Sequence, residues 1–179
     1  MDLTSGCGGV LSREDLLFRI ETEYQPLVTD WYDLTAQLQP NGFDLTLRDI
    51  SAISGSGTIG VENADRILPD LVELTWPADE MVQLSPGAYH LLFNEVLRLP
   101  ANVMALARPR SSLCRAGVAV HTAVWDAGYH GRSTSLLVVS NPAGIRLQRN
   151  ARLVQLVFFQ LSRPTGAGYS GVYQGENLA

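Results

Sequence analysis

The sequence predicts a single, mostly-β domain with a short helix near its N-terminus. Short apolar runs recur along the chain between Gly, Pro and Asn residues, a pattern typical of an all-β sandwich or barrel. No long helical period follows residue 25, and no internal repeat is found. The 179 residues, 46% hydrophobic and 17% charged, are enough for one globular domain with a sizeable core.

The N-terminal part predicts one helix followed by one strand. Residues 11–20 form a short amphipathic pattern, with Ser12 as the expected N-cap and Asp15 as the acid of a capping box. Residues 38–47 contain turn residues that lead into an alternating strand. Residues 51–61 are rich in Gly and Ser and indicate a loop or hairpin tip.

The rest of the chain predicts a series of strands and then a loose end. Apolar runs occur at residues 82–84, 89–92, 95–99, 103–107, 118–124, 135–139, 145–147 and 153–161. Residues 163–179 are rich in Gly and small polar side chains. We therefore expect one domain over residues 1–179, with a core over about 11–162 and a mobile C-terminal arm over 163–179.

Composition excludes several classes of protein. The net charge is −5 and no basic stripe occurs, which argues against nucleic-acid binding. All thirteen cationic residues are Arg, so a Lys-dependent phosphate loop and Schiff-base chemistry are excluded. Cys7 and Cys114 are too few for a disulfide framework or a zinc site. No membrane-length apolar segment and no secretion signal is found, so we expect a cytoplasmic protein without membrane partners.

The most informative segment runs from residue 107 to residue 131. Arg110 next to Ser111 and Ser112 offers a bidentate cation and hydroxyl donors, which suit polyphosphate oxygens, and a short helix starting there would direct its N–H groups at the same anion. Asp126 follows a hairpin pattern and is suited to activate a water against a phosphate. Each motif alone is also compatible with an ordinary polar turn.

The two motifs together, RSSL-x-R-x-G followed by WD-x-G-Y-x-G, resemble those of the superfamily of deoxyuridine triphosphatases (dUTPases) and dCTP deaminases. Within it the chain looks most like the archaeal-type dUTPases, over about residues 11–176. The resemblance implies a distorted jelly roll (a β-clip) that assembles as a homotrimer with active sites at subunit interfaces. It also implies Mg²⁺-dependent hydrolysis of dUTP to dUMP and pyrophosphate, which limits uracil incorporation into DNA and supplies dUMP for dTMP synthesis.

The resemblance also assigns roles to residues of the central motifs. It implies that Asp126 orients the attacking water and takes its proton, and that Tyr129 lies under the deoxyribose. The expected triphosphate contacts are Arg110, Ser111, Ser112, Gln155 and Arg115. The expected base and sugar contacts, made mainly by the hairpin backbone, are Val120, His121, Thr122 and Val124 besides Tyr129.

Other positions match the superfamily less closely. Asp44, in Asn-Gly-Phe-Asp-Leu, is implied to lie near the Mg²⁺–triphosphate through water, although Phe43 replaces the usual Tyr. Asn150 replaces the common Gly of the fourth motif, a tolerable change because Asn also accepts a left-handed turn. Many dUTPases have an Arg- and Gly-rich arm with a Phe, whereas the Gly-rich arm of this chain carries Tyr173 and Gln174 and looks more like that of the deaminases and the archaeal dUTPases.

One absence separates the two chemistries of the superfamily. Its metal-free dCTP deaminases use a Glu on the strand after the hairpin to move protons. In this sequence that position is held by Leu136 or Val138, and no acidic residue occurs between Asp126 and Glu176. The sequence therefore favours the hydrolase. The alternatives are a monofunctional or bifunctional dCTP deaminase and a non-catalytic, nucleotide-binding regulatory trimer.

Overall fold

The computed structural model describes residues 9–178. The strands are β1 (Gly9–Val10), β2 (Val28–Thr29), β3 (Leu38–Gln39), β4 (Gly42–Ser54), β5 (Asp70–Glu73), β6 (Met81–Leu84), β7 (Gly87–Arg98), β8 (Val103–Pro109), β9 (Val118–His121), β10 (His130–Val139), β11 (Ile145–Gln148) and β12 (Arg152–Gln160). The helices are α1 (Arg13–Glu21), α2 (Leu34–Gln37), α3 (Ser111–Arg115) and the 3₁₀ turn η1 (Asn63–Asp65). The predicted mostly-β architecture is confirmed.

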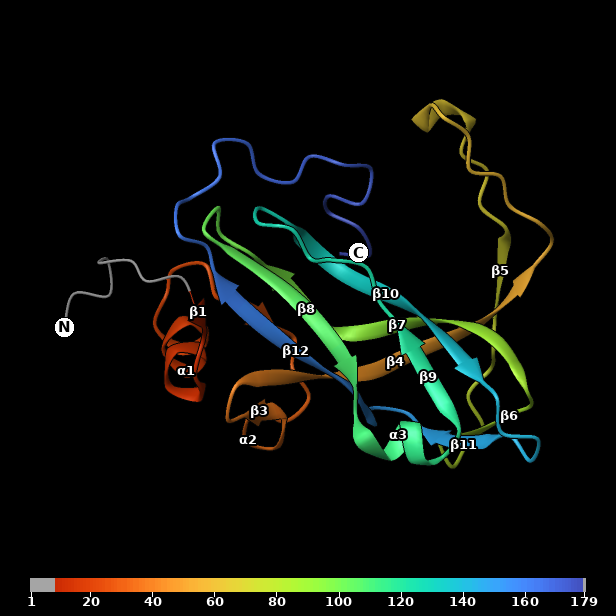
Figure 1. Cartoon of the computed structure of the whole chain (residues 1–179). Coiled ribbons are helices and arrows are strands. Elements are labelled where there is room, and N and C mark those ends of the chain that lie inside the picture. The colour runs from red at the N-terminus through yellow and green to blue at the C-terminus, as the bar shows by residue number, and fades with distance from the viewer. Residues whose placement is uncertain (1–8, 179) are drawn as a thin grey trace.

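One long, curled sheet carries most of the strands (Figure 1). Its order is β1-β12-β4-β7-β10-β9, with β8 on β12 and β5 on β4, and β11 pairs with β6 in a small second sheet. Among residues 9–178, the largest fully buried side chains are Phe43, Phe93 and Phe158. Burial of each such ring contributes about 1.5–3 kcal/mol to stability.

The N-terminal helix begins as the sequence predicts. The Ser12 hydroxyl accepts a hydrogen bond from the Asp15 N–H at 3.2 Å, and Asp15 Oδ2 accepts one from the Ser12 N–H at 2.9 Å. This capping box satisfies two backbone donors that the first turn leaves free. Leu16 and Ile20 are the buried side chains of this helix.

Strand β4 belongs to two parts of the sheet. Residues 43–46 pair with β12, whereas residues 47–52 pair with β7. The change of partner falls between Thr46 and Leu47, and the register of each pairing is irregular close to this point. Strand β4 therefore bends where it passes from one partner to the other.

Strand β7 differs from the sequence prediction. The two expected runs, 89–92 and 95–99, form one strand with an irregularity between them. Arg132 of β10 pairs with Val96 and Thr134 pairs with Leu92, so residues 93–95 of β7 lie opposite Ser133. The polar Asn94 interrupts the apolar pattern because this bulge directs its side chain toward β4.

Two further boundaries differ from those predicted. Strand β4 continues to Ser54, so only the second half of the Gly/Ser-rich stretch is a hairpin tip. Strand β9 ends at His121, and the expected run over 118–124 continues as an irregular loop. Cys114 is free and exposed, whereas Cys7 lies outside the described residues. Between residues 9 and 178, no helix combines the length and apolar character needed to span a membrane.

The C-terminal arm returns to the domain after β12 and lies along the start of β10 (Figure 1). The Tyr169 N–H donates to the Ala127 carbonyl at 2.8 Å, and the Gly175 N–H donates to the His130 carbonyl at 2.7 Å. In return, the Arg132 N–H donates to the Glu176 carbonyl at 3.0 Å. The structure thus shows a docked arm, and its mobility stays a prediction.

Candidate functional site

A cavity of about 520 Å³ lies between the loop that follows β9, the start of β10 and the C-terminal arm. The loop contributes Val124, Trp125 and Asp126 to its lining, and Tyr129 follows directly. Ser133 and Thr134 line it from β10, and His90 lines it from β7. Tyr169, Tyr173 and Glu176 line it from the arm, so this cavity is bounded by segments that are distant in sequence.

Asp126 is the first residue of a short turn in the cavity wall. The preceding residue, Trp125, exchanges two backbone hydrogen bonds with Ala105 of β8, at 2.9 and 3.1 Å. The Asp126 carbonyl accepts a hydrogen bond from the Tyr129 N–H at 3.1 Å, which closes the turn. The loop is therefore fixed on both sides of Asp126, whose side chain stays exposed beside the cavity.

Gly128 is required at the centre of this turn. Its φ of +91° lies in the region that favours glycine. A Cβ atom at this position would also lie 2.8 Å from the Gly168 Cα atom of the arm. The glycine therefore permits both the turn that places Asp126 and the close approach of the arm.

Tyr129 is buried beneath the arm. Its hydroxyl donates a hydrogen bond to Glu176 Oε1 at 2.8 Å, and its ring meets the Tyr169 ring edge-on at a centroid distance of 5.8 Å. Burial, together with the Glu176 carboxylate, raises the pKa of Tyr129 above its usual range. Burial also raises the pKa of Glu176, although the hydrogen bond from Tyr129 opposes this shift. Tyr129 therefore keeps its proton and acts as a donor.

Gln174 attaches the arm to the turn below it. Its Nε2 donates to the Gly128 carbonyl at 3.0 Å, and its Oε1 accepts from the His130 N–H at 3.1 Å. The neighbouring Tyr173 ring lies 5.8 Å from the Arg66 guanidinium, within the range of a cation–π contact. Tyr173 thus lines the cavity, and the Gln174 side chain binds backbone groups of Gly128 and His130 next to it.

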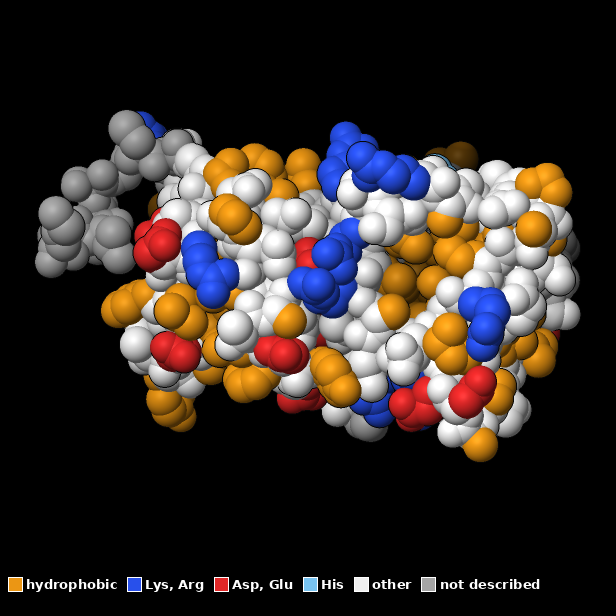
Figure 2. Space-filling model, turned by 90° about the horizontal axis from the view of Figure 1, so that it is seen from below, with side chains coloured by type: hydrophobic (Ala, Val, Ile, Leu, Met, Phe, Trp, Pro, Cys, Tyr) orange, Lys and Arg blue, Asp and Glu red, His pale blue; other side chains and the backbone are white. Residues whose placement is uncertain are grey.

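A second group of candidate residues surrounds Asp44. Asp44 Oδ2 lies 3.3 Å from Arg110 Nε and 3.4 Å from Arg152 Nη1. The carboxyl group is almost fully buried, so desolvation raises its pKa, and the two guanidinium groups partly offset this. Gln155 lies directly opposite Asp44 on β12. Figure 2 shows Arg side chains gathered on the face of the molecule that includes the α3 end.

The hydroxyl groups of the RSS motif face solvent on α3. Ser111 and Ser112 are exposed, as is Arg115 at the end of this five-residue helix. Arg110 precedes the helix, and its backbone N–H donates to the Leu153 carbonyl of β12 at 2.9 Å. This contact fixes the motif beside Asp44 and Gln155, so cations and hydroxyl donors converge on one end of the sheet.

The structure does not bring all of the predicted site residues together in one chain. Within residues 9–178, the cavity lining includes none of the RSS motif, Asp44 or Gln155. Val124 and Tyr129 line it, but the Val120 side chain is buried in the core, His121 is exposed and Thr122 is half-buried. The candidates therefore form a cavity group around Asp126 and Tyr129 and a cationic group around Asp44 and Arg110.

Sequence reasoning missed several of the lining residues. His90, Ser133, Thr134 and Glu176 belong to no recognisable motif. Glu176 is conspicuous in the sequence as an acidic residue in a Gly-rich arm. Its partner Tyr129, however, lies 47 residues away along the chain. Local patterns do not reveal such a contact.

The described residues do not form a metal cage. No group of three or more His, Cys, Asp or Glu side chains suited to a metal occurs among residues 9–178. The buried Asp44 oxygen faces two guanidinium groups instead. The two guanidinium groups suit the oxygens of a bound phosphate, and a Mg²⁺ ion at this site would take most of its ligands from the phosphate and from water.

Comparison with known proteins identifies the family of this chain. The sequence profile of a family described as dCTP deaminase-like matches residues 10–161. The chain belongs to the dCTP deaminase-like family. The chain is also similar to a probable deoxyuridine 5'-triphosphate nucleotidohydrolase of Archaeoglobus fulgidus, which is 50% identical over 169 residues, 94% of this chain and 98% of the relative.

Two further relatives and one solved structure agree with this assignment. The probable deoxyuridine 5'-triphosphate nucleotidohydrolase of Methanosarcina mazei is 49% identical, over 85% of this chain and 89% of the relative. The deoxyuridine 5'-triphosphate nucleotidohydrolase of Methanocaldococcus jannaschii is 38% identical, over 78% and 88%. A crystal structure of the 2'-deoxycytidine 5'-triphosphate deaminase from Agrobacterium tumefaciens has a TM-score of 0.62 and 25% identity, over 86% of this chain. The match spans 48% of that structure, about half its length.

Proposed function

We propose that this protein is a dUTP diphosphatase, which hydrolyses dUTP to dUMP and pyrophosphate. The observation that carries the proposal is the cavity that presents an exposed Asp126 next to the ring of Tyr129. The names of the archaeal relatives, which cover most of the chain at 38–50% identity, support the same reaction. We expect it to act in the cytoplasm, where it would limit dUTP and supply dUMP.

The reaction requires a water molecule, a base and a held triphosphate. We propose that Asp126 accepts a proton from the water as its oxygen bonds to the α-phosphorus. The bond from the α-phosphorus to the bridging oxygen then breaks, and its electron pair leaves with pyrophosphate. Arg110, Ser111, Ser112 and Gln155 would hold the phosphates in line for this attack.

Mg²⁺ bound to the triphosphate would neutralise charge that develops on the phosphate oxygens. The chain's own contribution in the cationic group is the placement of Arg110 and Arg152 by the buried Asp44. Two cations on one buried carboxylate leave their other N–H groups free to face an anion. A water-mediated contact from Asp44 to the metal stays a prediction.

We propose a homotrimer in which the cavity group of one subunit lies next to the cationic group of a neighbouring subunit. The cavity group and the cationic group are separate within one chain, and in the proposed assembly a neighbouring copy would supply one of them to the other. The hairpin around β5 adds an apolar surface for such contacts, because its exposed side chains include Ile53, Ile59, Val61, Ile67, Leu68, Leu71 and Val72. We propose that these surfaces lie between subunits.

One observation favours deamination of dCTP as a second candidate. Glu176 brings a carboxyl group with a raised pKa into the cavity, although neither Leu136 nor Val138 carries one on β10. A proton shuttle is what the deaminase reaction needs. However, Glu176 is already hydrogen-bonded to Tyr129 and lies on the arm, so we favour the hydrolase.

A substrate panel tests the proposed function. Purified protein with Mg²⁺ is offered dUTP, dCTP and UTP separately, and pyrophosphate and ammonia are followed. We expect pyrophosphate from dUTP, little from UTP because the Tyr129 ring excludes a 2′-hydroxyl, and no ammonia from dCTP. Ammonia from dCTP would show that Glu176 or another group replaces the deaminase Glu that β10 lacks. Loss of ammonia release in a Glu176→Gln variant would assign that role to Glu176.

A further inference from the structure

The structure contains a buried carboxyl group that the proposed reaction does not use. Glu95 of β7 is completely buried, next to the bend of β4. Its Oε2 accepts from the Thr46 N–H at 2.9 Å, and its Oε1 accepts from the Thr46 hydroxyl at 2.5 Å. Gln37 Nε2 donates to the same Oε1 at 2.6 Å. A buried carboxyl group is costly unless donors surround it, so this arrangement is specific.

The partners of Glu95 connect it to the cationic group. Gln37 Nε2 also donates to the Asp44 carbonyl at 2.8 Å, and Gln37 Oε1 accepts from the Asp33 N–H at 2.7 Å. Thr46 is two residues from Asp44 on the same strand. One carboxyl group therefore holds the backbone of β4 on both sides of Leu45, which sets the position of the Asp44 side chain.

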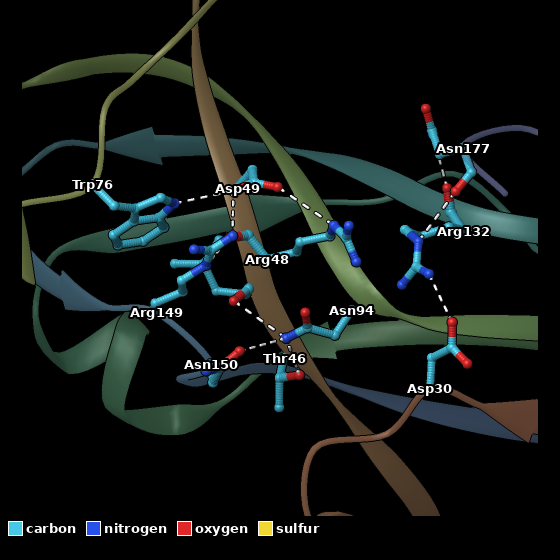
Figure 3. Close-up of polar contacts among 11 residues, drawn as sticks. Asp30, Thr46, Arg48, Asp49, Trp76, Asn94, Arg132, Arg149, Asn150 and Asn177 are labelled. Carbon is cyan, nitrogen blue, oxygen red and sulfur yellow. Dashed lines mark hydrogen bonds and ion pairs between the residues drawn. The ribbon is translucent and has the colours of Figure 1, made fainter. Parts of the chain in front are cut away.

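The neighbouring Asn94 links the same point of β4 to the turn that leads into β12. Its Nδ2 donates to the Thr46 hydroxyl and to Asn150 Oδ1, each at 2.9 Å (Figure 3). Asn150 has a left-handed φ of +64° in the turn that leads into β12, which carries Arg152 and Gln155. Consecutive residues of a regular strand point to opposite faces, so the bulge over residues 93–95 is what lets both side chains reach Thr46.

We propose that Glu95 is a positioning residue for the triphosphate subsite, which acts through Thr46 and Gln37 to hold Asp44 against Arg110 and Arg152. The inference rests on the proposed dUTP hydrolysis. A carboxyl group is suited to this task because it accepts hydrogen bonds from a backbone N–H, a hydroxyl and an amide at one point. An apolar residue would fill the same volume without fixing the strand.

Glu95→Gln tests the proposal with a matched comparison of ligands. The Gln37 amide is oriented by Asp33 and Asp44, so a Gln at position 95 can keep only part of the network. We expect the Kd of a non-hydrolysable α,β-imido analogue of dUTP to rise about 10-fold or more. The Kd of dUMP, which lacks the β- and γ-phosphates, should change by less than about 2-fold.

A core variant on the same strand controls for general destabilisation. Leu97 is fully buried in β7 and belongs to neither candidate group, so Leu97→Ala should lower stability without changing the ratio of the two Kd values. If Glu95→Gln does not fold, Thr46→Val, which removes the hydroxyl but keeps the shape, should shift the same ratio. Equal changes for both ligands, or no change, would overturn the proposal.

Crystal structures of the wild type and Glu95→Gln without nucleotide separate this inference from the proposed function. We expect the 3.3 Å contact between Arg110 Nε and Asp44 Oδ2 in the wild type and its loss in the variant. An unchanged contact in the variant would overturn the positioning role. A wild type that binds neither nucleotide would refute the proposed function, and the crystallographic comparison would still decide the role of Glu95.

Discussion

At the residue scale, three carboxyl groups among residues 9–178 have environments that disfavour their charge. Burial raises the pKa of Asp44, Glu95 and Glu176, and each group is held by donors or cations that oppose the shift. The Asp126 side chain is exposed at the cavity. This separation is useful for the proposed reaction, because an exposed carboxylate is available to take a proton from water while the buried groups hold the surrounding side chains in place.

The stability of the protein should depend on pH through Glu95. Burial raises the pKa of Glu95 from its ordinary 4.5 to about 7, so the folded state binds the proton more tightly than the unfolded state. The stabilisation is fully present below pH 4.5 and is lost as the pH rises through about 7. We expect the free energy of unfolding to fall by roughly 3 kcal/mol from this residue over that range.

Urea unfolding of the wild type and Glu95→Gln at several pH values measures this effect. The difference between the two proteins removes the contribution of Glu176, because Glu176 is bound to Tyr129 on the arm and does not contact Glu95. The difference should shrink as the pH rises. A difference that is constant between pH 4.5 and about 8 would show that Glu95 has an ordinary pKa.

At the element scale, the arm and the start of β10 depend on each other. The arm covers Tyr129 and supplies hydrogen-bond partners for the backbone of residues 128–132. Arg132 adds a side-chain link, because its Nε donates to the Asn177 carbonyl and its Nη2 pairs with Asp30 at 2.7 Å (Figure 3). Because most arm residues are exposed, we expect the arm to open at a much lower free-energy cost than the sheet.

Hydrogen exchange tests this dependence. The Arg132 N–H donates to the arm, so a chain that ends at Val172 should exchange this amide about 10-fold faster or more. The Leu137 amide, farther along β10 between β7 and β9, should be unaffected. Gln174→Ala, which removes only the contacts to Gly128 and His130, should have an intermediate effect. Unchanged exchange at Arg132 would mean that the arm is not docked in solution.

The elements that the sequence predicted well are those with local signals. The capping box at Ser12 and the apolar runs of β8, β11 and β12 needed no information from distant parts of the chain. The exposed β5 was missed because its pattern lacks a buried face, and β7 was divided in two because Asn94 lies at a bulge. The motifs likewise named Asp126 and Arg110, whereas Glu95 and Glu176 gain their surroundings only from strand pairing and arm docking.

At the scale of the whole molecule, one chain carries both groups of candidate residues without joining them. The cavity contains Asp126 and Tyr129, and the cationic group contains Arg110, Asp44 and Gln155. A closed, cyclic assembly places the same two surfaces of neighbouring copies together at every interface. The proposed homotrimer would then contain three equivalent composite sites, each completed by the neighbouring subunit.

Subunit mixing tests the composite site. Asp126→Asn and Arg110→Ala should each lose most of their turnover, because one lacks the base and the other a phosphate cation. When the two variants are unfolded and refolded together in equal amounts, about a quarter of the sites should combine an intact Asp126 with an intact Arg110. Native mass spectrometry should show mixed assemblies of the 19.5 kDa chain. Mixed assemblies without regained turnover would place both residues in the same subunit's site.

In the proposed reaction a water molecule attacks the α-phosphorus of dUTP, and oxygen labelling shows which phosphorus receives the water oxygen. The purified protein is incubated with dUTP and Mg²⁺ in ¹⁸O-water, and the products are analysed by mass spectrometry. We expect dUMP that carries the label in its phosphate and pyrophosphate that carries none. Label in pyrophosphate, release of orthophosphate with dUDP, or no conversion of dUTP would contradict it.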